Sequence, residues 1–348
     1  MRIGMLSRWN AACGVSLHAE LIGREWVKMG HRLTVFAPKN IRPVGEDEEY
    51  VIRCFSDEGD GEGRPFLNPE PFLTEDYEIF VAQRIEWAPL KLLKEIFPEI
   101  RRRAKTVYVI HERKPPTNPL FHEFEWDAIV CFDHRYRRTW SRIYPGKLRI
   151  IPYPVPRIRR GDKLSARKKL GLPLDKKIIL SYGWAPELHI NPVIPYLEEV
   201  AEKHDFIYLI IADPEALNKL KRRRFMLIRS ERPTLEKLYT YLHASDLCLI
   251  HKQPEEVREG EVVISSSVLM CLGALTPILT SDTEFVSTLD REVIKYRDLE
   301  ELKAILLKIL KEEYDLKETL EAAEKYAIEN SQTRIAEKFI KLFEELQA

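Results

Sequence analysis

The chain has 348 residues, of which 45% are apolar and 10% aromatic, so it can bury a large core and fold as two domains. Lysine plus arginine and aspartate plus glutamate each number 55, and the resulting zero net charge excludes a whole-chain argument for nucleic-acid binding. The five scattered cysteines include no CxxC pair, which disfavours a disulfide framework or structural zinc site and favours a cytoplasmic location.

The first half of the chain alternates short apolar runs with helical patterns. We expect strands at residues 2–7, 33–37, 51–55, 78–83, 106–110, 127–132 and 149–151. Helical patterns lie at residues 17–29, 88–104 and 134–144. Apolar strands that alternate with amphipathic helices predict a parallel sheet covered on both faces. Residues 56–71 are acidic and glycine-rich; we expect a mobile loop there, because the carboxylates do not follow EF-hand spacing.

The proline-rich and charged segment 151–176 predicts a hinge between two domains. The alternation then restarts, with expected strands at 178–182, 206–212, 225–228, 247–250, 277–280 and 293–295. Expected helices lie at 192–204, 214–222, 234–243, 266–273 and 299–313, followed by a helical tail at 316–346. The predicted fold class is therefore α/β, with two doubly wound, Rossmann-like parallel-sheet domains. Because such sheets bind ligands at the carboxyl ends of their strands, we expect a ligand between the two sheets.

The first strand, loop and helix do not predict a dinucleotide cofactor. Their loop contains the single glycine Gly14 in place of GxGxxG, and no acidic residue ends the next strand to hold a ribose. Gly14 and Val15 begin the helix, whose N–H groups are suited to an anion or a hydroxyl-rich ligand. The alternative, that Gly14 only allows a tight turn, stays equally open. We expect no cofactor and no metal.

The segment 134–149 is basic and interleaved with aromatic residues. It fits an amphipathic helix at the inner face of a membrane, or a solvated helix that packs Trp140 inward, and we favour the second. No apolar run approaches the roughly 18 residues that a membrane span requires. The charged fraction of 32%, without low-complexity tracts, disfavours disorder and suggests adaptation to heat.

An ordered set of motifs resembles the family-4-type glycosyltransferases of the GT-B fold. The motifs are CGVSLHAELI from Cys13, MGHRLTVFAP from Met29, IIPYPV from Ile150, YTYLHASD from Tyr239, GALTPILTSD from Gly273 and NSQTRIAE from Asn330. The resemblance implies an acceptor domain at 1–152, a nucleotide-sugar donor domain at 153–330 and a helix at 331–348 that packs back on the first domain. It also implies sugar transfer with retention and without a bound metal, from a nucleotide-sugar to an unidentified acceptor.

The resemblance further implies roles for individual residues. His111, at the end of an apolar strand, would face the transferred sugar, and Glu259 or Glu261 would contact the donor sugar. Two departures weaken the donor site. Trp184 and His189 replace the Arg and Lys that usually neutralise the diphosphate, and Met270 replaces a Glu that usually binds ribose.

Replacement groups for the diphosphate are present in the second half of the chain. Arg229 and Lys252 are expected in loops at strand ends, and Ser265, Ser266 and Ser267 open a helix with N–H groups. The alternatives are solvated surface charges for the two cations and simple helix capping for the serines. If the donor site is lost, the chain is a non-catalytic GT-B-like partner or sugar-binding protein; a nucleotide-sugar epimerase is a weaker alternative.

Overall fold

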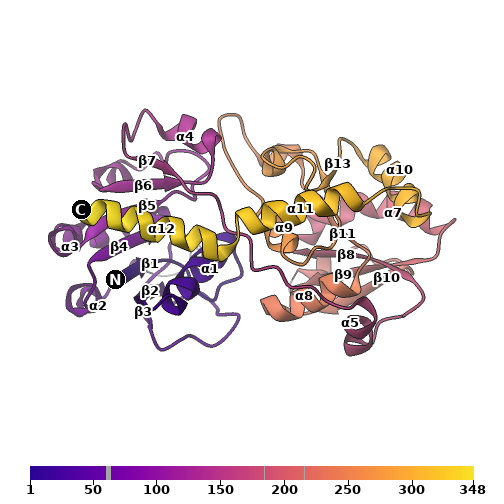
Figure 1. Ribbon diagram of the computed structural model, residues 1–348, viewed down its shortest axis with the longest axis horizontal. Coiled ribbons are helices and arrows are strands. Elements are labelled where there is room, and N and C mark those ends of the chain that lie inside the picture. Colours follow the sequence, from indigo (N-terminus) through magenta and orange to yellow (C-terminus); the bar gives the residue numbers. More distant parts are fainter. Residues whose placement is uncertain (60–63, 184, 215) are drawn as a thin grey trace. The chain divides into compact units, whose positions relative to one another are not determined.

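The computed structural model describes residues 1–59, 64–183, 185–214 and 216–348. This part of the chain divides into two compact units (Figure 1). Unit 1 comprises Met1–Pro154, Gly260–Val262 and Gln332–Ala348, and unit 2 comprises Val155–Glu259 and Val263–Ser331. Each unit contains one parallel β-sheet with helices packed on it, and each is described by itself.

The sheet of unit 1 has the strand order β3-β2-β1-β4-β5-β6-β7, with all neighbours parallel. Its strands are β1 (Arg2–Leu6), β2 (Arg32–Pro38), β3 (Val51–Phe55), β4 (Ile79–Gln83), β5 (Lys105–Val109), β6 (Ala128–Cys131) and β7 (Leu148–Ile150). Its helices are α1 (Gly14–Lys28), α2 (Pro69–Thr74), α3 (Leu90–Arg103), α4 (His134–Trp140) and α12 (Gln332–Gln347). The strand order reverses between β1 and β4, and open sheets of this kind bind ligands beyond the carboxyl ends of such strands.

The sheet of unit 2 has the order β10-β9-β8-β11-β12-β13, again parallel throughout. Its strands are β8 (Lys177–Gly183), β9 (Phe206–Ala212), β10 (Met226–Ser230), β11 (Leu247–Ile250), β12 (Ile278–Ser281) and β13 (Ile294–Tyr296). Its helices are α5 (Lys163–Leu170), α6 (Pro186–His189), α7 (Ile194–Ala201), α8 (Leu235–Ala244), α9 (Ser266–Leu272), α10 (Leu299–Leu310) and α11 (Lys317–Glu329). Here the order reverses between β8 and β11.

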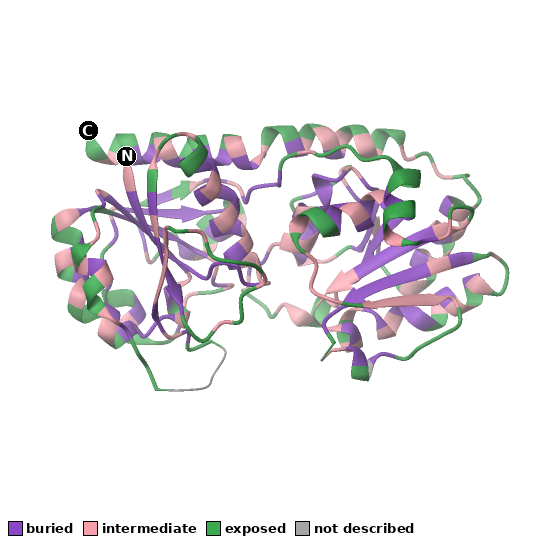
Figure 2. Ribbon diagram, turned by 90° about the horizontal axis from the view of Figure 1, so that it is seen from below, coloured by how far each residue is buried: buried purple, intermediate pink, exposed green. Residues whose placement is uncertain are grey.

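Burial explains why these segments form strands and helices. The central strands are buried along most of their length, as expected for sheets covered on both faces, whereas the helices alternate buried and exposed stripes (Figure 2). The predicted fold class, with two doubly wound parallel sheets, is confirmed.

The C-terminal helix α12 belongs to unit 1 and lies against α1 (Figure 1). Phe339 and Phe343 pack on Trp26 of α1, with ring centroids 5.8 and 5.4 Å away. The indole Nε1–H of Trp26 donates a hydrogen bond to the Ala336 carbonyl at 3.2 Å. The expected return of the C-terminal helix to the first domain is therefore confirmed.

Three local features differ from expectation. The helix expected at 214–222 is reduced to a 3₁₀ turn at Leu217–Lys219, followed by a run of like charges that does not favour a helix. The segment 151–176 contains the unit boundary at Pro154 and Val155, as expected, but it also contains the unexpected α5, whose start is capped by Asp162 and which ends at the left-handed Gly171 (φ 63°). The expected tail helix is split at Asn330 into α11 and α12.

The basic segment after β6 forms the short helix α4, which turns two aromatic side chains into unit 1. Tyr136 and Trp140 on α4 are both buried, which supports the inward-packing interpretation and not a membrane-surface helix. Among the described residues no helix is long and apolar enough to cross a membrane. In the segment expected to be a mobile loop, Asp57 forms a buried ion pair with Arg8, and residues 60–63 lie outside the described residues.

Candidate functional site

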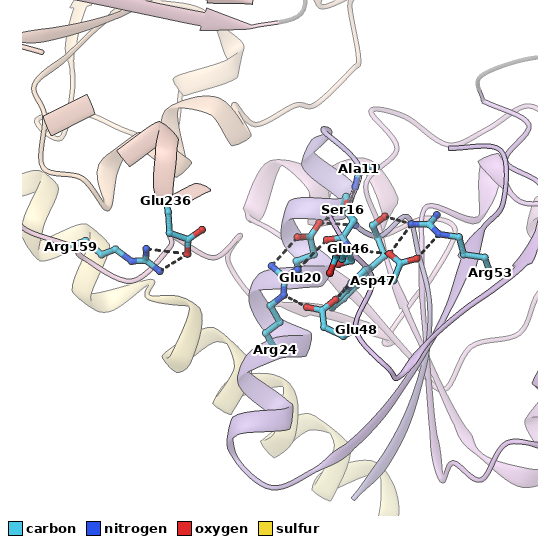
Figure 3. Close-up of polar contacts among 12 residues, drawn as sticks. Ala11, Ser16, Glu20, Arg24, Glu46, Asp47, Glu48, Arg53, Arg159 and Glu236 are labelled. Atoms are coloured by element: carbon cyan, nitrogen blue, oxygen red, sulfur yellow. Dashed lines mark hydrogen bonds and ion pairs between the residues drawn. The ribbon is translucent and has the colours of Figure 1, made fainter. Parts of the chain in front are cut away.

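The loop between β1 and α1 is held by a polar network (Figure 3). Asn10 has a left-handed φ of 51°, which asparagine adopts more readily than most residues. Its N–H donates to Glu20 at 3.0 Å, and its side-chain oxygen accepts from Arg24 at 3.1 Å. Arg24 also donates to Glu48 at 2.6 Å. Glu48 and Arg24 therefore help to fix the loop after β1, which lies where the strand order of unit 1 reverses.

Gly14 is the first residue of α1, at the end of this loop. Its backbone lies in the helix and not in the left-handed region, so a tight turn does not explain the glycine. Its carbonyl accepts a hydrogen bond from the Tyr153 hydroxyl at 2.6 Å. The preceding residue, Cys13, makes no side-chain capping bond, and Val15 is buried. A ligand-facing role for the start of α1 stays a prediction.

Two histidines meet one amide side chain at the carboxyl ends of β4 and β5. Gln83 is the last residue of β4, and its Oε1 lies 3.0 Å from His18 Nδ1 and 3.0 Å from His111 Nε2. His18, from α1, is fully buried, and the two imidazoles pack edge to face with centroids 5.1 Å apart. His111 follows β5, as predicted. His18 is a buried packing residue that also shares the Gln83 oxygen with His111.

Both imidazoles are neutral at physiological pH. Burial lowers the pKa of His18 to about 3, against an ordinary value of 6.5. Burial, and then the neighbouring His18 and Arg84, lower the pKa of His111 well below its ordinary value. A neutral imidazole both donates and accepts hydrogen bonds, and this suits a hydroxyl-bearing ligand.

The buried His18 predicts a loss of stability in acid. Between pH 6.5 and about 3 the unfolded state binds a proton at this side chain and the folded state does not, so stability falls as the pH falls through this window. From pH 7 to pH 5 we expect His18 to lower the free energy of unfolding by about 2 kcal/mol. Urea unfolding at both pH values measures the decrease, which His18→Phe should reduce by a similar amount. An equal decrease in both proteins would contradict the assignment.

The turn after β5 is anchored by a buried carboxyl group. Glu112 accepts hydrogen bonds from the Tyr108 hydroxyl and from the His111 N–H, the latter at 3.1 Å. Burial raises the pKa of Glu112. These bonds fix the backbone on which His111 stands.

The structure separates the two glutamates that were expected to contact a donor sugar. Glu261 belongs to unit 1, where its carboxylate lies 3.2 Å from Lys114 Nζ and 3.7 Å from Arg113 Nη1. It therefore lies beside the segment that follows His111. Glu259 belongs to unit 2 and is exposed. Of the two, Glu261 is grouped in the same unit as His111.

A second polar cluster follows the carboxyl ends of β11 and β12 in unit 2. The N–H of Lys252 donates to Ser281 Oγ at 2.8 Å, and this hydroxyl donates to the Lys252 carbonyl at 2.7 Å. Lys252 Nζ lies 3.2 Å from Nε2 of His189, the last residue of α6. Nε2 of His189 lies 2.9 Å from Glu256 Oε2. Two of the predicted donor residues, Lys252 and His189, are thus brought together at the switch point of unit 2.

The charge state of this cluster follows from its burial. Burial and then Lys252 lower the pKa of His189. The carboxylate of Glu256 only accepts, so the nearby Nε2 of His189 is the atom that donates to it. Nδ1 of His251, the residue before Lys252, lies 2.7 Å from the Tyr296 hydroxyl, and burial lowers the pKa of His251 to about 4. Lys252 is therefore the cationic side chain of this cluster.

The other residues predicted to contact the diphosphate are the three serines at the start of α9 and Arg229, and their positions support that role less well. Ser265 caps α9 by accepting a hydrogen bond from the Val268 N–H at 3.3 Å, which supports the capping alternative. Ser266 and Ser267 begin α9 and are partly exposed. Arg229 lies within β10 and not in a loop, where it donates to the Leu170 carbonyl at 3.1 Å.

Trp184 and Met270 are two positions at which the sequence differs from the resembling enzymes. Trp184 lies outside the described residues. Met270 lies in α9, and its carbonyl accepts a hydrogen bond from the Tyr239 hydroxyl at 3.1 Å. Among the described residues, no group of three or more His, Cys, Asp or Glu side chains is arranged to hold a metal ion.

The sequence analysis missed three residues of these clusters: Gln83, Glu256 and Ser281. Gln83 and Ser281 each end an apolar strand with a polar side chain, a signal that was available at the carboxyl edge of a parallel sheet. Glu256 lies in a 3₁₀ turn, and nothing in its local sequence indicates that it faces His189.

No family model matches the chain. Several solved structures, however, match it over nearly its full length. A glycosyltransferase from Rickettsia africae is 14% identical, with a TM-score of 0.67, over 99% of this chain and 98% of its own. The sucrose-phosphate synthase from Thermosynechococcus elongatus is 14% identical, with a TM-score of 0.68, over 99% of both chains. The pneumococcal O-GlcNAc transferase, solved with UDP and GlcNAc, is 11% identical, with a TM-score of 0.67, over 100% of this chain and 99% of its own. The chain thus shares the two-sheet fold of these glycosyltransferases.

Proposed function

We propose that the protein is a glycosyltransferase that moves a sugar from a nucleotide-sugar donor to an acceptor. The observation that carries the proposal is the position of Lys252, a half-buried cation beyond the carboxyl end of β11, where the strand order of unit 2 reverses. The fold shared with glycosyltransferases over the whole chain supports it.

Departure of a nucleoside diphosphate leaves negative charge that the protein must stabilise. In the resembling enzymes an Arg and a Lys after the first strand of the donor domain do this. Here His189 stands at the place of that Lys, and Lys252 reaches it from the neighbouring strand, with Nζ 3.2 Å from the imidazole. We therefore assign the diphosphate contact to Lys252, whose ammonium lies 3.4 Å from His189 Nδ1, the acceptor nitrogen of a ring that donates from Nε2 to Glu256. Since a lysine supplies the positive charge, transfer should not require a metal.

Unit 1 supplies the other contacts in this proposal. His111 contacts the transferred sugar, and the N–H groups at Gly14 and Val15 face the acceptor or a sugar hydroxyl. Glu261 holds Arg113 and Lys114 beside this region. Retention of anomeric configuration is implied by the resemblance, and the proton NMR spectrum of the product tests it.

A thermal-shift panel of nucleoside diphosphates and their sugar conjugates tests the proposal, beginning with UDP and UDP-glucose. A ligand at 100 times its Kd should add about 2.7 kcal/mol to the stability of the native state, a clear rise in melting temperature. A matched panel of the nucleosides should give much smaller shifts, because they lack the diphosphate. Absence of any shift with all donors at millimolar concentration would contradict the proposal.

The second candidate is a protein that keeps the fold and binds a nucleotide or sugar without transferring it. Met270, where the resembling enzymes have a ribose-binding Glu, favours it. The two candidates differ in turnover. A bound sugar nucleotide that is neither transferred nor hydrolysed over hours would favour the non-catalytic protein, and release of the free nucleoside diphosphate would favour the transferase.

A further inference from the structure

The amide of Gln83 joins two buried histidines that come from different elements. Gln83 is 2% exposed, and its Oε1 lies 3.0 Å from His18 Nδ1 on α1 and 3.0 Å from His111 Nε2 after β5. Its Nε2 faces the sulfur of Met5 at 3.6 Å. The three side chains that form this clamp (Gln83, His18 and His111) all belong to unit 1.

The hydrogen-bond inventory assigns the protons of this clamp. An amide oxygen only accepts, so both imidazoles must donate to it, His18 from Nδ1 and His111 from Nε2. His18 Nε2 is then a bare lone pair, and it is buried without a partner among the described residues. The His18 ring packs against the aromatic rings of Phe132, Tyr153 and Phe339, with ring centroids 5.2 to 5.9 Å apart. The opposite amide orientation would instead bury an unpaired N–H at His18, which costs more than an unpaired acceptor.

We propose that Gln83 is a positioning residue that fixes His111 with its proton on Nε2, so that Nδ1 faces the ligand as a hydrogen-bond acceptor. Within residues 1–59, 64–183, 185–214 and 216–348, no hydrogen-bond partner occupies this Nδ1. The group that it recognises is then a hydrogen-bond donor such as a hydroxyl, and not an ionised phosphate or carboxylate, which only accepts. That this hydroxyl belongs to a sugar rests on the proposed function.

The surroundings keep His111 in this uncharged form. His18 packs on it from α1, and Arg84, which follows β4, adds positive charge that opposes protonation. Glu112, on the same turn, accepts from the His111 backbone N–H and from Tyr108, and not from the imidazole. Phe132 after β6 covers the ring at 5.0 Å. Over the neutral pH range Nδ1 of His111 therefore accepts a hydrogen bond from a hydroxyl, and the ring stays uncharged.

Nitrogen-15 NMR of the histidine side chains in the full chain tests the tautomer directly, without any ligand. The His111 signals are identified by their loss in His111→Ala. We expect a neutral ring protonated on Nε2 from pH 8 to pH 5.5. Gln83→Met, which keeps the size of the side chain and removes the acceptor, should give a mixture of tautomers. Gln332→Met, the same change at a buried glutamine on α12, should leave the His111 signals unchanged.

Gln83→Glu provides a second variant that keeps both hydrogen bonds. Its carboxylate should raise the pKa of His111 and make the ring cationic at a higher pH, because an opposite charge within hydrogen-bond distance favours the protonated ring. A wild-type ring protonated on Nδ1, a charged ring at pH 7, or an unchanged tautomer in folded Gln83→Met would overturn the proposal. The NMR outcome stands whether or not the protein transfers sugar. If it does, the pH profile of transfer should show a new inflection in Gln83→Glu only.

Discussion

Replacing Lys252 by methionine is expected to weaken the binding of a nucleoside diphosphate by about 10- to 100-fold. A hydrogen bond to a charged group contributes about 1.5–3 kcal/mol, and methionine keeps most of the volume of the side chain while removing the charge. Lys252 is tied to Ser281 through its backbone, so the variant should keep the local fold. Calorimetric titration of UDP, or of whichever diphosphate binds best, into both proteins measures the loss.

Lys177→Met is the matched control for this variant. Lys177 is also partly exposed and belongs to the same sheet, but it begins β8 at the opposite, amino-terminal edge, where it pairs with Glu312 at 2.7 Å. Its removal should leave diphosphate binding within about twofold of the wild type, because a partly exposed pair contributes little. Equal binding by Lys252→Met and the wild type would remove Lys252 from the site.

Replacing Trp26 by alanine is expected to lower the free energy of unfolding of unit 1 by about 3–5 kcal/mol. Trp26 is completely buried, and it joins α1 to α12 through Phe339, Phe343 and the Ala336 carbonyl. The variant therefore opens a cavity and leaves a carbonyl without its donor. Urea unfolding followed by fluorescence and circular dichroism measures the change.

Trp26→Phe separates the two causes. It keeps an aromatic ring between the helices but loses the hydrogen bond to Ala336, so its cost should be clearly smaller than that of alanine. Limited proteolysis should cleave the α12 segment faster in Trp26→Ala than in the wild type. An unfolding free energy within about 1 kcal/mol of the wild type would contradict the packing of α12 on α1.

The regular elements could be predicted because local patterns determine them. β9 and β11 were expected with their observed limits, since both are apolar runs with clear ends. α5 was missed because its weakly amphipathic, charged sequence lies among prolines, although Asp162 and Gly171 offered capping signals. A helix was predicted at 214–222 from its periodicity, which takes no account of the run of like charges that follows Leu217–Lys219.

The sequence predicts the site residues that follow a strand, but it does not predict which side chains from separate elements contact one another. His111 and Lys252 each follow an apolar strand, so their place at a carboxyl edge could be inferred from the sequence. The contact of His111 with Gln83 and His18 joins three separate elements, and no local pattern records it. Arg229 shows the opposite case, because a charged residue near a strand end lies inside the edge strand β10.

The central claim is that a cation of unit 2 binds the diphosphate of a nucleotide-sugar. Calorimetric titration of UDP and of uridine into the same wild-type protein tests it most directly, because the two ligands differ only in the diphosphate. The account predicts that UDP binds at least about tenfold more tightly than uridine, with a difference that shrinks as salt is added. Equal affinities for UDP and uridine, together with equal affinities for the diphosphate and the nucleoside of every other base, would contradict it.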